Sequence, residues 1–258
     1  MEIRSTRHSL RELNKLLGFE VRNILYKNKS INENQLIQFK KVLNLNFKSK
    51  EIEFDYARNL GIYASTDPLK KIRKCGELAE FIGIMLGDGN IYRNRIKIAF
   101  DKRNEKYLSY VERLFENLFG VKFKKTVYSE TNQAYLYYYN KRLIEKLILL
   151  GLKRGHKIKK NIGIPGWIKE NKNYIRRCIK GLIDTDGCIY FSKRDKQKYI
   201  KFTNFNRQLL EDFKKTTSML NYSFVKANKN NWCLYRKDEV ARFIKEIKPL
   251  KNTYGIMG

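Results

Sequence analysis

Hydrophobic positions recur with two different periods along this chain. Between Asn104 and Phe119 the spacing is three and four residues, which predicts an amphipathic helix that ends at Gly120. The apolar positions of that helix are Leu108, Val111, Leu114, Phe115 and Leu118. After Gly89 the period is two, with basic residues alternating with increasingly apolar ones from 93 to 98. This alternation is typical of a half-buried strand with one basic face.

The same reading places further elements in a regular order. An apolar helix runs from Cys75 toward Gly87, and strands are expected at 121–124 and 135–139, followed by a helix at 143–150. In the second half, strands are expected at 199–203, 224–227 and 232–235, with helices at 209–220 and 240–247. The sequence therefore predicts an α+β fold of two αββαββα repeats, the second with a longer hairpin through 193–196.

Two segments repeat at a constant offset of 98 residues, 81–92 and 179–190. The matching positions are Gly83 and Gly181, Asp88 and Asp186, Gly89 and Gly187, and Tyr92 and Tyr190. This internal duplication predicts two pseudo-symmetric halves, residues 75–163 and residues 164–258, the latter beginning with the connector Ile164–Ile168.

The first 74 residues have no copy elsewhere in the chain. Ser9 and Glu12 form a capping-box pattern before a short helix that stops at Gly18. Two more short helices are expected within residues 1–47, an arrangement that resembles a helix-turn-helix module with Arg22 and Lys27 on its recognition helix. A helical docking appendage is the alternative. Residues 48–74 are expected to form a linker or arm.

Small residues form a stripe on the first repeated helix. Ala79, Gly83 and Gly87 recur every four residues, and Gly181 and Thr185 continue the stripe in the second copy. Two helices can approach closely along such a stripe. Asp88 and Asp186 then fall at equivalent helix ends beside the pseudo-twofold axis.

Composition points to a globular protein with a polyanionic partner. The 258 residues are 42% hydrophobic and carry a net charge of +29, with basic residues spread among aromatics. Nucleic acid is the expected partner, and no segment is apolar enough for a membrane span or a signal peptide. Four cysteines without a CxxC pair favour free thiols in a reducing compartment. Cytoplasmic residence is expected, with an organellar address left open.

Paired carboxylates beside a polyanion imply a metal ion, because the like charges would otherwise repel each other and the phosphates. Oxygen ligands suit Mg²⁺, which supports phosphodiester hydrolysis. For each aspartate considered alone, the alternative is a helix C-cap or an Asx-turn beside glycine.

At these residues the chain resembles the LAGLIDADG homing endonucleases, specifically the single-chain members with two motifs. Residues 181–187, Gly-Leu-Ile-Asp-Thr-Asp-Gly, are close to the consensus, whereas residues 81–89 keep only the glycine and aspartate anchors. The resemblance covers about residues 75–258. It implies a saddle of two β-sheets whose concave faces lie along the DNA major groove, with the paired helices as the interface.

The resemblance also assigns residues to the site. Asp88 and Asp186 match the metal-binding acids, and the carbonyls of Gly87 and Thr185 match the main-chain ligands. By strand position, Lys102 and Asn204 would organise water and phosphate, although a turn or a DNA-backbone contact is an equal alternative for both. Asp101 departs from the usual amide. Asp184, opposite the apolar Leu86, matches a capping or packing position.

Sequence reading is expected from outward side chains of the strands. Arginine and lysine can pair with guanine edges, and all of these residues can anchor phosphates. The candidates are Arg93, Arg95, Lys97, Lys122, Lys124, Tyr137, Tyr139, Tyr199, Lys201 and Lys226.

The first functional hypothesis is therefore a monomeric, Mg²⁺-dependent endonuclease that cuts a long asymmetric DNA site and leaves short 3′ overhangs. A non-cleaving binder of the same fold, an RNA maturase or a transcription regulator, is the second. Protein splicing is disfavoured because the first and last residues lack the required nucleophile and His-Asn pair.

Overall fold

The computed structural model describes residues 10–18, 69–250 and 256–257. The chain divides into two compact units, residues 1–68 and 69–258. In the first unit, α1 (Leu10–Leu17) ends at Gly18 with φ +70°, as the capping-box pattern predicted. Arg22, Lys27 and the other expected helices of this unit lie outside the described residues.

The first repeat of the second unit has the predicted order of elements. Its members are α5 (Gly76–Gly87), β1 (Gly89–Tyr92), β2 (Arg95–Asp101), α6 (Glu105–Phe119), β3 (Lys124–Val127), β4 (Gln133–Tyr139) and α7 (Lys141–Leu149). The strands form an antiparallel sheet of order β1-β2-β4-β3. Asn104 caps α6, and Gly120 ends it with φ +75°.

The second repeat follows the same order after the short helix α8 (Gly166–Lys169). It comprises α9 (Lys172–Asp186), β5 (Gly187–Ser192), β6 (Gln197–Thr203), α10 (Arg207–Met219), β7 (Val225–Asn228), β8 (Asn231–Leu234) and α11 (Lys237–Ile247). Its sheet has the order β7-β8-β6-β5-β9, where β9 (Ile256–Met257) pairs in parallel with β5. The predicted α+β fold of two repeats is confirmed.

Several boundaries differ from the sequence prediction. Asn171 caps α9, so this helix begins well before the repeated segment. The connector contains α8, a short helix that the sequence analysis did not predict because Pro165 and Gly166 indicate a turn. Residues 69–74, expected in the linker, belong to the second unit, where Lys70 N donates to the Phe119 carbonyl.

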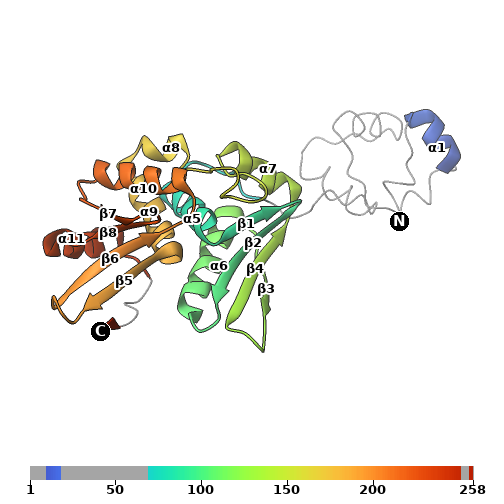
Figure 1. The fold of residues 1–258 in the computed structure, drawn as a ribbon. Helices are drawn as coiled ribbons and strands as arrows, with labels where there is room; N and C mark the ends of the chain where they lie inside the picture. The colour runs from blue at the N-terminus through green and yellow to red at the C-terminus, as the bar shows by residue number, and fades with distance from the viewer. Residues whose placement is uncertain (1–9, 19–68, 251–255, 258) are drawn as a thin grey trace. The chain divides into compact units, whose positions relative to one another are not determined.

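The two repeats meet at α5 and α9, which lie side by side between the two sheets (Figure 1). Glycine makes this approach possible: a Cβ on Gly181 would lie 2.8 Å from Ile84 N, and one on Gly83 would collide with the Cys178 carbonyl. Backbone atoms cannot move aside as a flexible side chain can. The predicted small-residue stripe is therefore the contact surface of the two halves.

A buried ion network lies on the same interface. Glu80 is fully buried on α5, and its carboxylate contacts Lys180 Nζ at 2.6 Å, Arg177 at 2.8 Å and the Tyr110 hydroxyl at 2.7 Å. Lys180 also contacts Asp184 at 3.0 Å. Burial alone would lower the pKa of Lys180, but the charges of Asp184 and Glu80 raise it above its usual value. The network joins the two helices by charge as well as by shape.

Each sheet packs one face on the helices of its own repeat. In the first repeat, Ile96, Ile98 and Leu136 are fully buried on that face. In the second, Phe202 stacks on Phe213 of α10 with ring centroids 4.1 Å apart. None of the described helices is long and apolar enough to cross a membrane.

The glycine contact predicts a large difference between two single-methyl additions. Gly181→Ala puts a Cβ against the α5 backbone, and we expect the free energy of unfolding to fall by about 1–3 kcal/mol. Gly166→Ala is the matched control, because nothing lies within 4 Å of its Cβ. Its stability should stay within about 0.5 kcal/mol of the parent protein in urea titrations. Equal stability of the two variants would contradict the packing argument.

The buried network predicts that Lys180→Met is strongly destabilising. It would leave Glu80 and Asp184 buried without their shared cation, and we expect a loss of about 3–5 kcal/mol in chemical denaturation. Lys172→Met, at an exposed position of the same helix, should change stability by no more than about 0.5 kcal/mol. A mild effect at Lys180 would mean that the interface depends on packing alone.

Candidate metal centre and nucleic-acid interface

Two aspartates stand where the paired helices end. Asp88 is the C-cap residue of α5, with its N–H donating to the Ile84 carbonyl at 3.1 Å, and Asp186 is the last residue of α9. The residues just before them are in contact across the interface, since a Cβ on Gly87 would lie 2.6 Å from Thr185 Cβ. The predicted metal-binding acids, Asp88 and Asp186, and their predicted main-chain ligands therefore gather at one point.

Asn204 lies at this point as well. Its side-chain amide donates to Asp186 Oδ2 at 2.7 Å, and its own backbone N–H donates to the Asn230 carbonyl. Asn204 also accepts a hydrogen bond from Asn206 N at 2.8 Å, which holds the turn before α10. The amide is thus held in position to orient the Asp186 carboxylate.

The first half does not repeat this arrangement. Gly89 pairs with Ile98 and Gly187 pairs with Phe202, so Ile98 and Phe202 occupy equivalent positions in the two repeats. Two residues further on, Phe100 is therefore the equivalent of Asn204. Phe100 is buried and packs on Tyr107 with ring centroids 5.7 Å apart. The pseudo-symmetry of the fold therefore does not extend to the side chains around the two aspartates.

Lys102 lies in the turn that follows β2. Its Nζ donates to the carbonyls of Tyr128 and Ser129, both at 3.2 Å, so it holds the loop between β3 and β4. Asp101 forms an ion pair with Arg103, which lowers its pKa to about 2. β2 continues three residues past the partner of Gly89, which places Lys102 in the turn after the strand; its role in organising water and phosphate stays a prediction.

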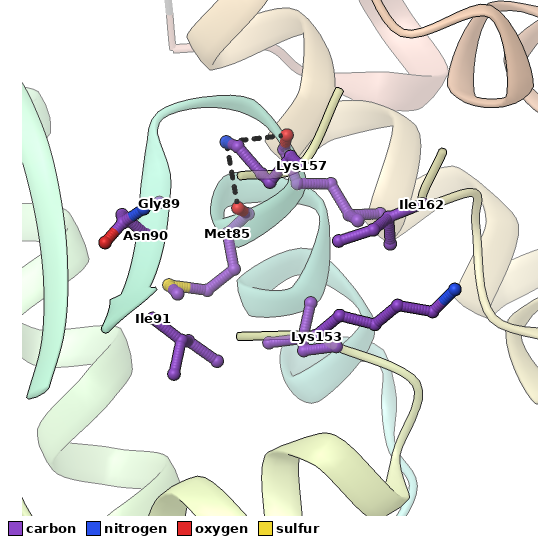
Figure 2. Close-up of a pocket in the computed structure, with 9 residues that line it drawn as sticks. Met85, Gly89, Asn90, Ile91, Lys153, Lys157 and Ile162 are labelled. Atoms are coloured by element: carbon purple, nitrogen blue, oxygen red, sulfur yellow. Dashed lines mark hydrogen bonds between the residues drawn. The ribbon is translucent and has the colours of Figure 1, made fainter. Parts of the chain in front are cut away.

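Lys157 is a site residue that the sequence analysis missed. It lies on the longer connector between α7 and α8, residues 150–165. Its Nζ donates to the carbonyls of Leu86 at 3.0 Å and Met85 at 3.4 Å (Figure 2). It also donates to the carbonyl of Gly87. Burial lowers the pKa of Lys157, and the charges of Asp186 and Asp88 oppose that shift. In the sequence, Lys157 is distinguished only by its place in the basic run 153–160, which resembles a solvated charge cluster.

The residues at this point fit a hard divalent cation. They offer carboxylate and carbonyl oxygens, the donors that Mg²⁺ and Ca²⁺ prefer. The Lys157 ammonium also contacts the Gly87 carbonyl. Within the described residues, no three His, Cys, Asp or Glu side chains gather to hold a metal, so water and phosphate would complete the coordination.

The exposed face of the first sheet is basic and aromatic. Register pairs Arg95 with Tyr139 and Lys97 with Tyr137, and Lys124 lies opposite Tyr137 on the other side. Paired residues share a face, so these five predicted contacts lie together, opposite the buried Ile96 and Ile98. Lys97 also covers the Tyr135 ring, with Nζ 3.4 Å from its centroid.

Two of the predicted strand residues lie outside the strands. Arg93 occupies the turn between β1 and β2 with φ +51°, where its guanidinium lies 5.4 Å from the Tyr92 ring centroid. Lys122 precedes β3 and lies 3.5 Å from Glu116. Alternation alone could not show where each hairpin turns.

The second sheet presents a different face. Lys201 lies between Cys188 and Cys233, with its Nζ 5.9 Å from the Tyr190 ring centroid. Tyr199 shares this face but is only 8% exposed. Tyr199 packs between Tyr190 and Tyr235, which covers most of its ring.

Lys226 does not lie on the face of Lys201. It pairs with Trp232, which pairs with the buried Phe202 on the helix side of the sheet. Lys226 is nevertheless exposed on β7, so its DNA contact stays a prediction, although the strand pairing does not place it beside Tyr199 and Lys201.

A family model described as a LAGLIDADG-like domain matches residues 173–248. The chain carries a LAGLIDADG-like domain. This LAGLIDADG match extends from α9 through α11, the second repeat with its aspartate, and the first repeat has the same order of elements.

Solved structures and one curated protein are similar to the chain. Full-length DUF199/WhiA from Thermotoga maritima is 9% identical with a TM-score of 0.50, covering 70% of this chain and 59% of that one. Variants of the homing endonuclease I-DmoI are 18% identical with a TM-score of 0.45, covering 67% and 88%. A replication factor C small subunit of Methanocaldococcus jannaschii is 27% identical over 225 residues, and the match spans only 12% of that protein.

Proposed function

We propose that this LAGLIDADG protein is a monomeric, divalent-metal-dependent endonuclease that cuts double-stranded DNA at a long asymmetric site and leaves short 3′ overhangs. The observation that carries the proposal is the meeting of Asp88 and Asp186 at the adjoining ends of α5 and α9. Both acids come from one chain, so no second copy is needed to complete the pair. The net charge of +29 supports a nucleic-acid partner.

The residues of the site have separable roles in this proposal. The carboxylates of Asp88 and Asp186, with the carbonyls of Gly87 and Thr185, would hold the ion. When bound, Mg²⁺ would supply an activated water and stabilise the leaving oxygen. Asn204 donates to Asp186 Oδ2 and so fixes which oxygen of that carboxylate is directed at a ligand.

The exposed sheet faces would position the duplex over the acids. Arg95, Lys97 and Lys124 place three cations on one face of the first sheet, where they can neutralise phosphates or contact guanine edges. The second sheet offers Lys201 within an aromatic surface instead. Two unlike faces fit a target without twofold symmetry.

A non-cleaving nucleic-acid binder is the second candidate. The observation that favours it is Phe100, an apolar residue at the register where the second half has Asn204. RNA is the partner to examine if the protein proves to be a maturase.

The decisive experiment uses Asp88→Asn and Asp186→Asn. The parent protein is incubated with a randomised double-stranded DNA library and Mg²⁺, and new ends are sequenced to find the cut site. Each variant should lose double-strand cleavage at least about a hundredfold while retaining DNA binding, since only the ligand charge is removed. Asp238→Asn, on an exposed side chain of α11, is the control that should cut normally.

Two results would reject the nuclease proposal. One is the absence of any discrete cut site despite specific binding by the parent protein, which would favour the non-cleaving candidate. The other is undiminished cutting by both asparagine variants.

Asn204→Ala tests the asymmetry of the pair. It removes the hydrogen bond to Asp186 but no ligand charge, so we expect one strand to be cut more slowly than the other. A supercoiled plasmid carrying the site should then accumulate as the nicked form, by several-fold relative to the parent. Equal slowing of both strands would contradict a role confined to the Asp186 half.

A further inference from the structure

Lys157 stands at the point where the two repeats and the connector meet. Its side chain extends to the C-terminal end of α5, where its Nζ contacts the carbonyls of Met85 and Leu86 (Figure 2). It also contacts the next carbonyl, that of Gly87. The connector itself is held to the first sheet, because Gly155 N donates to the Ile91 carbonyl at 2.8 Å. Lys157 is thus directed at the helix end by a tethered backbone.

The end of α5 needs a cation from outside the helix. The last carbonyls of a helix carry the negative end of its dipole, and a basic residue in the last turn commonly balances it. The last turn of α5 has no basic residue, and Asp88 follows it directly with a further negative charge. Lys157 supplies the missing positive charge from a segment 70 residues away.

The same place is the one proposed for the divalent ion. Gly87 O is one of its main-chain ligands, and the charges of both Asp88 and Asp186 act on Lys157. A divalent cation on Gly87 O would stand within a few ångströms of the ammonium, where repulsion between the two charges is strong. The ammonium and the ion therefore compete for one oxygen and one electrostatic minimum.

We propose that Lys157 is a built-in cation that occupies the Gly87 side of the aspartate pair in the free protein and must withdraw before a divalent ion binds there. The inference rests on the proposed metal site. It makes Lys157 a positioning residue that keeps the acids together and lowers ion affinity until a ligand displaces it. The lysine stem has four rotatable bonds, so the ammonium can leave without moving the tethered connector.

The first test measures Mn²⁺ binding by calorimetry in the absence of DNA. Lys157→Met keeps an unbranched side chain, one atom shorter, and removes its charge, and we expect Mn²⁺ to bind about tenfold more tightly than to the parent protein. Lys153→Met is the matched control. Lys153 is an exposed lysine of the same connector and lines the same pocket as Lys157, and the Mn²⁺ affinity of this variant should equal that of the parent protein. Unchanged Mn²⁺ affinity in Lys157→Met would overturn the proposal.

Thermal unfolding of the same variant provides a second readout. Without divalent ions, Lys157→Met should melt below the parent because the helix end and both aspartates lose their cation. Saturating Ca²⁺ should restore most of that difference in the variant while raising the parent melting temperature less. Equal Ca²⁺-induced shifts in both proteins would overturn the proposal.

The third test uses the parent protein only, so it remains possible if the Lys157→Met variant fails to fold. Reductive methylation of the parent protein is followed by mass spectrometry at Lys157, with and without Ca²⁺. Ion binding should increase the labelling rate at Lys157 several-fold and leave Lys153 unchanged, because the displaced ammonium enters solvent. A rate at Lys157 that does not respond to saturating Ca²⁺ would overturn the proposal.

These readouts separate the inference from the proposed function. If Asp186→Asn abolishes Mn²⁺ binding while Lys157→Met leaves it unchanged, the metal site stands and the role of Lys157 fails. If the parent protein never cuts DNA but Lys157→Met binds Mn²⁺ more tightly, the nuclease proposal fails and the role of Lys157 stands.

Discussion

The close approach of α5 and α9 is the constraint on which the rest of the molecule depends. Gly83, Gly87 and Gly181 remove the side chains that would separate the two backbones, and the opposing atoms include main-chain atoms that cannot yield. Because Asp88 and Asp186 directly follow the contact between Gly87 and Thr185, the packing that joins the repeats also assembles the candidate metal centre. Stability and chemistry share one interface.

Charge at this interface is balanced by cations from several elements. Lys180 and Arg177 compensate Glu80 within the buried helix pair, and Lys157 compensates the aspartates at the helix ends. An acid that is buried without such a partner would cost several kcal/mol. The two lysines therefore differ in their exposure to competition. Lys180 has no access to a competing ion, whereas Lys157 contacts the Gly87 carbonyl, which is a candidate metal ligand.

Pseudo-symmetry in this protein belongs to the backbone and stops at the side chains. Both repeats have the same order of elements, yet Asn204 faces one aspartate while Phe100 holds the corresponding register in the other half. The sheet faces differ as well, with lysine and arginine on the first and a tyrosine cluster around Lys201 on the second. The two halves of the duplication therefore present different side chains on similar backbones.

The sequence by itself determined the repeat, the order of elements, the glycine stripe and the position of each aspartate at a helix end. These features follow from local periodicity and from a repeat at a constant offset, and both can be recognised in the linear sequence. Only the tertiary structure decided that Arg93 lies in a turn, that Lys226 pairs with Trp232, that Lys102 holds a loop, and that Lys157 reaches the end of α5 at the candidate metal centre. Hairpin register and contacts across 70 residues depend on how separate segments pack, and no pattern within a short window specifies them.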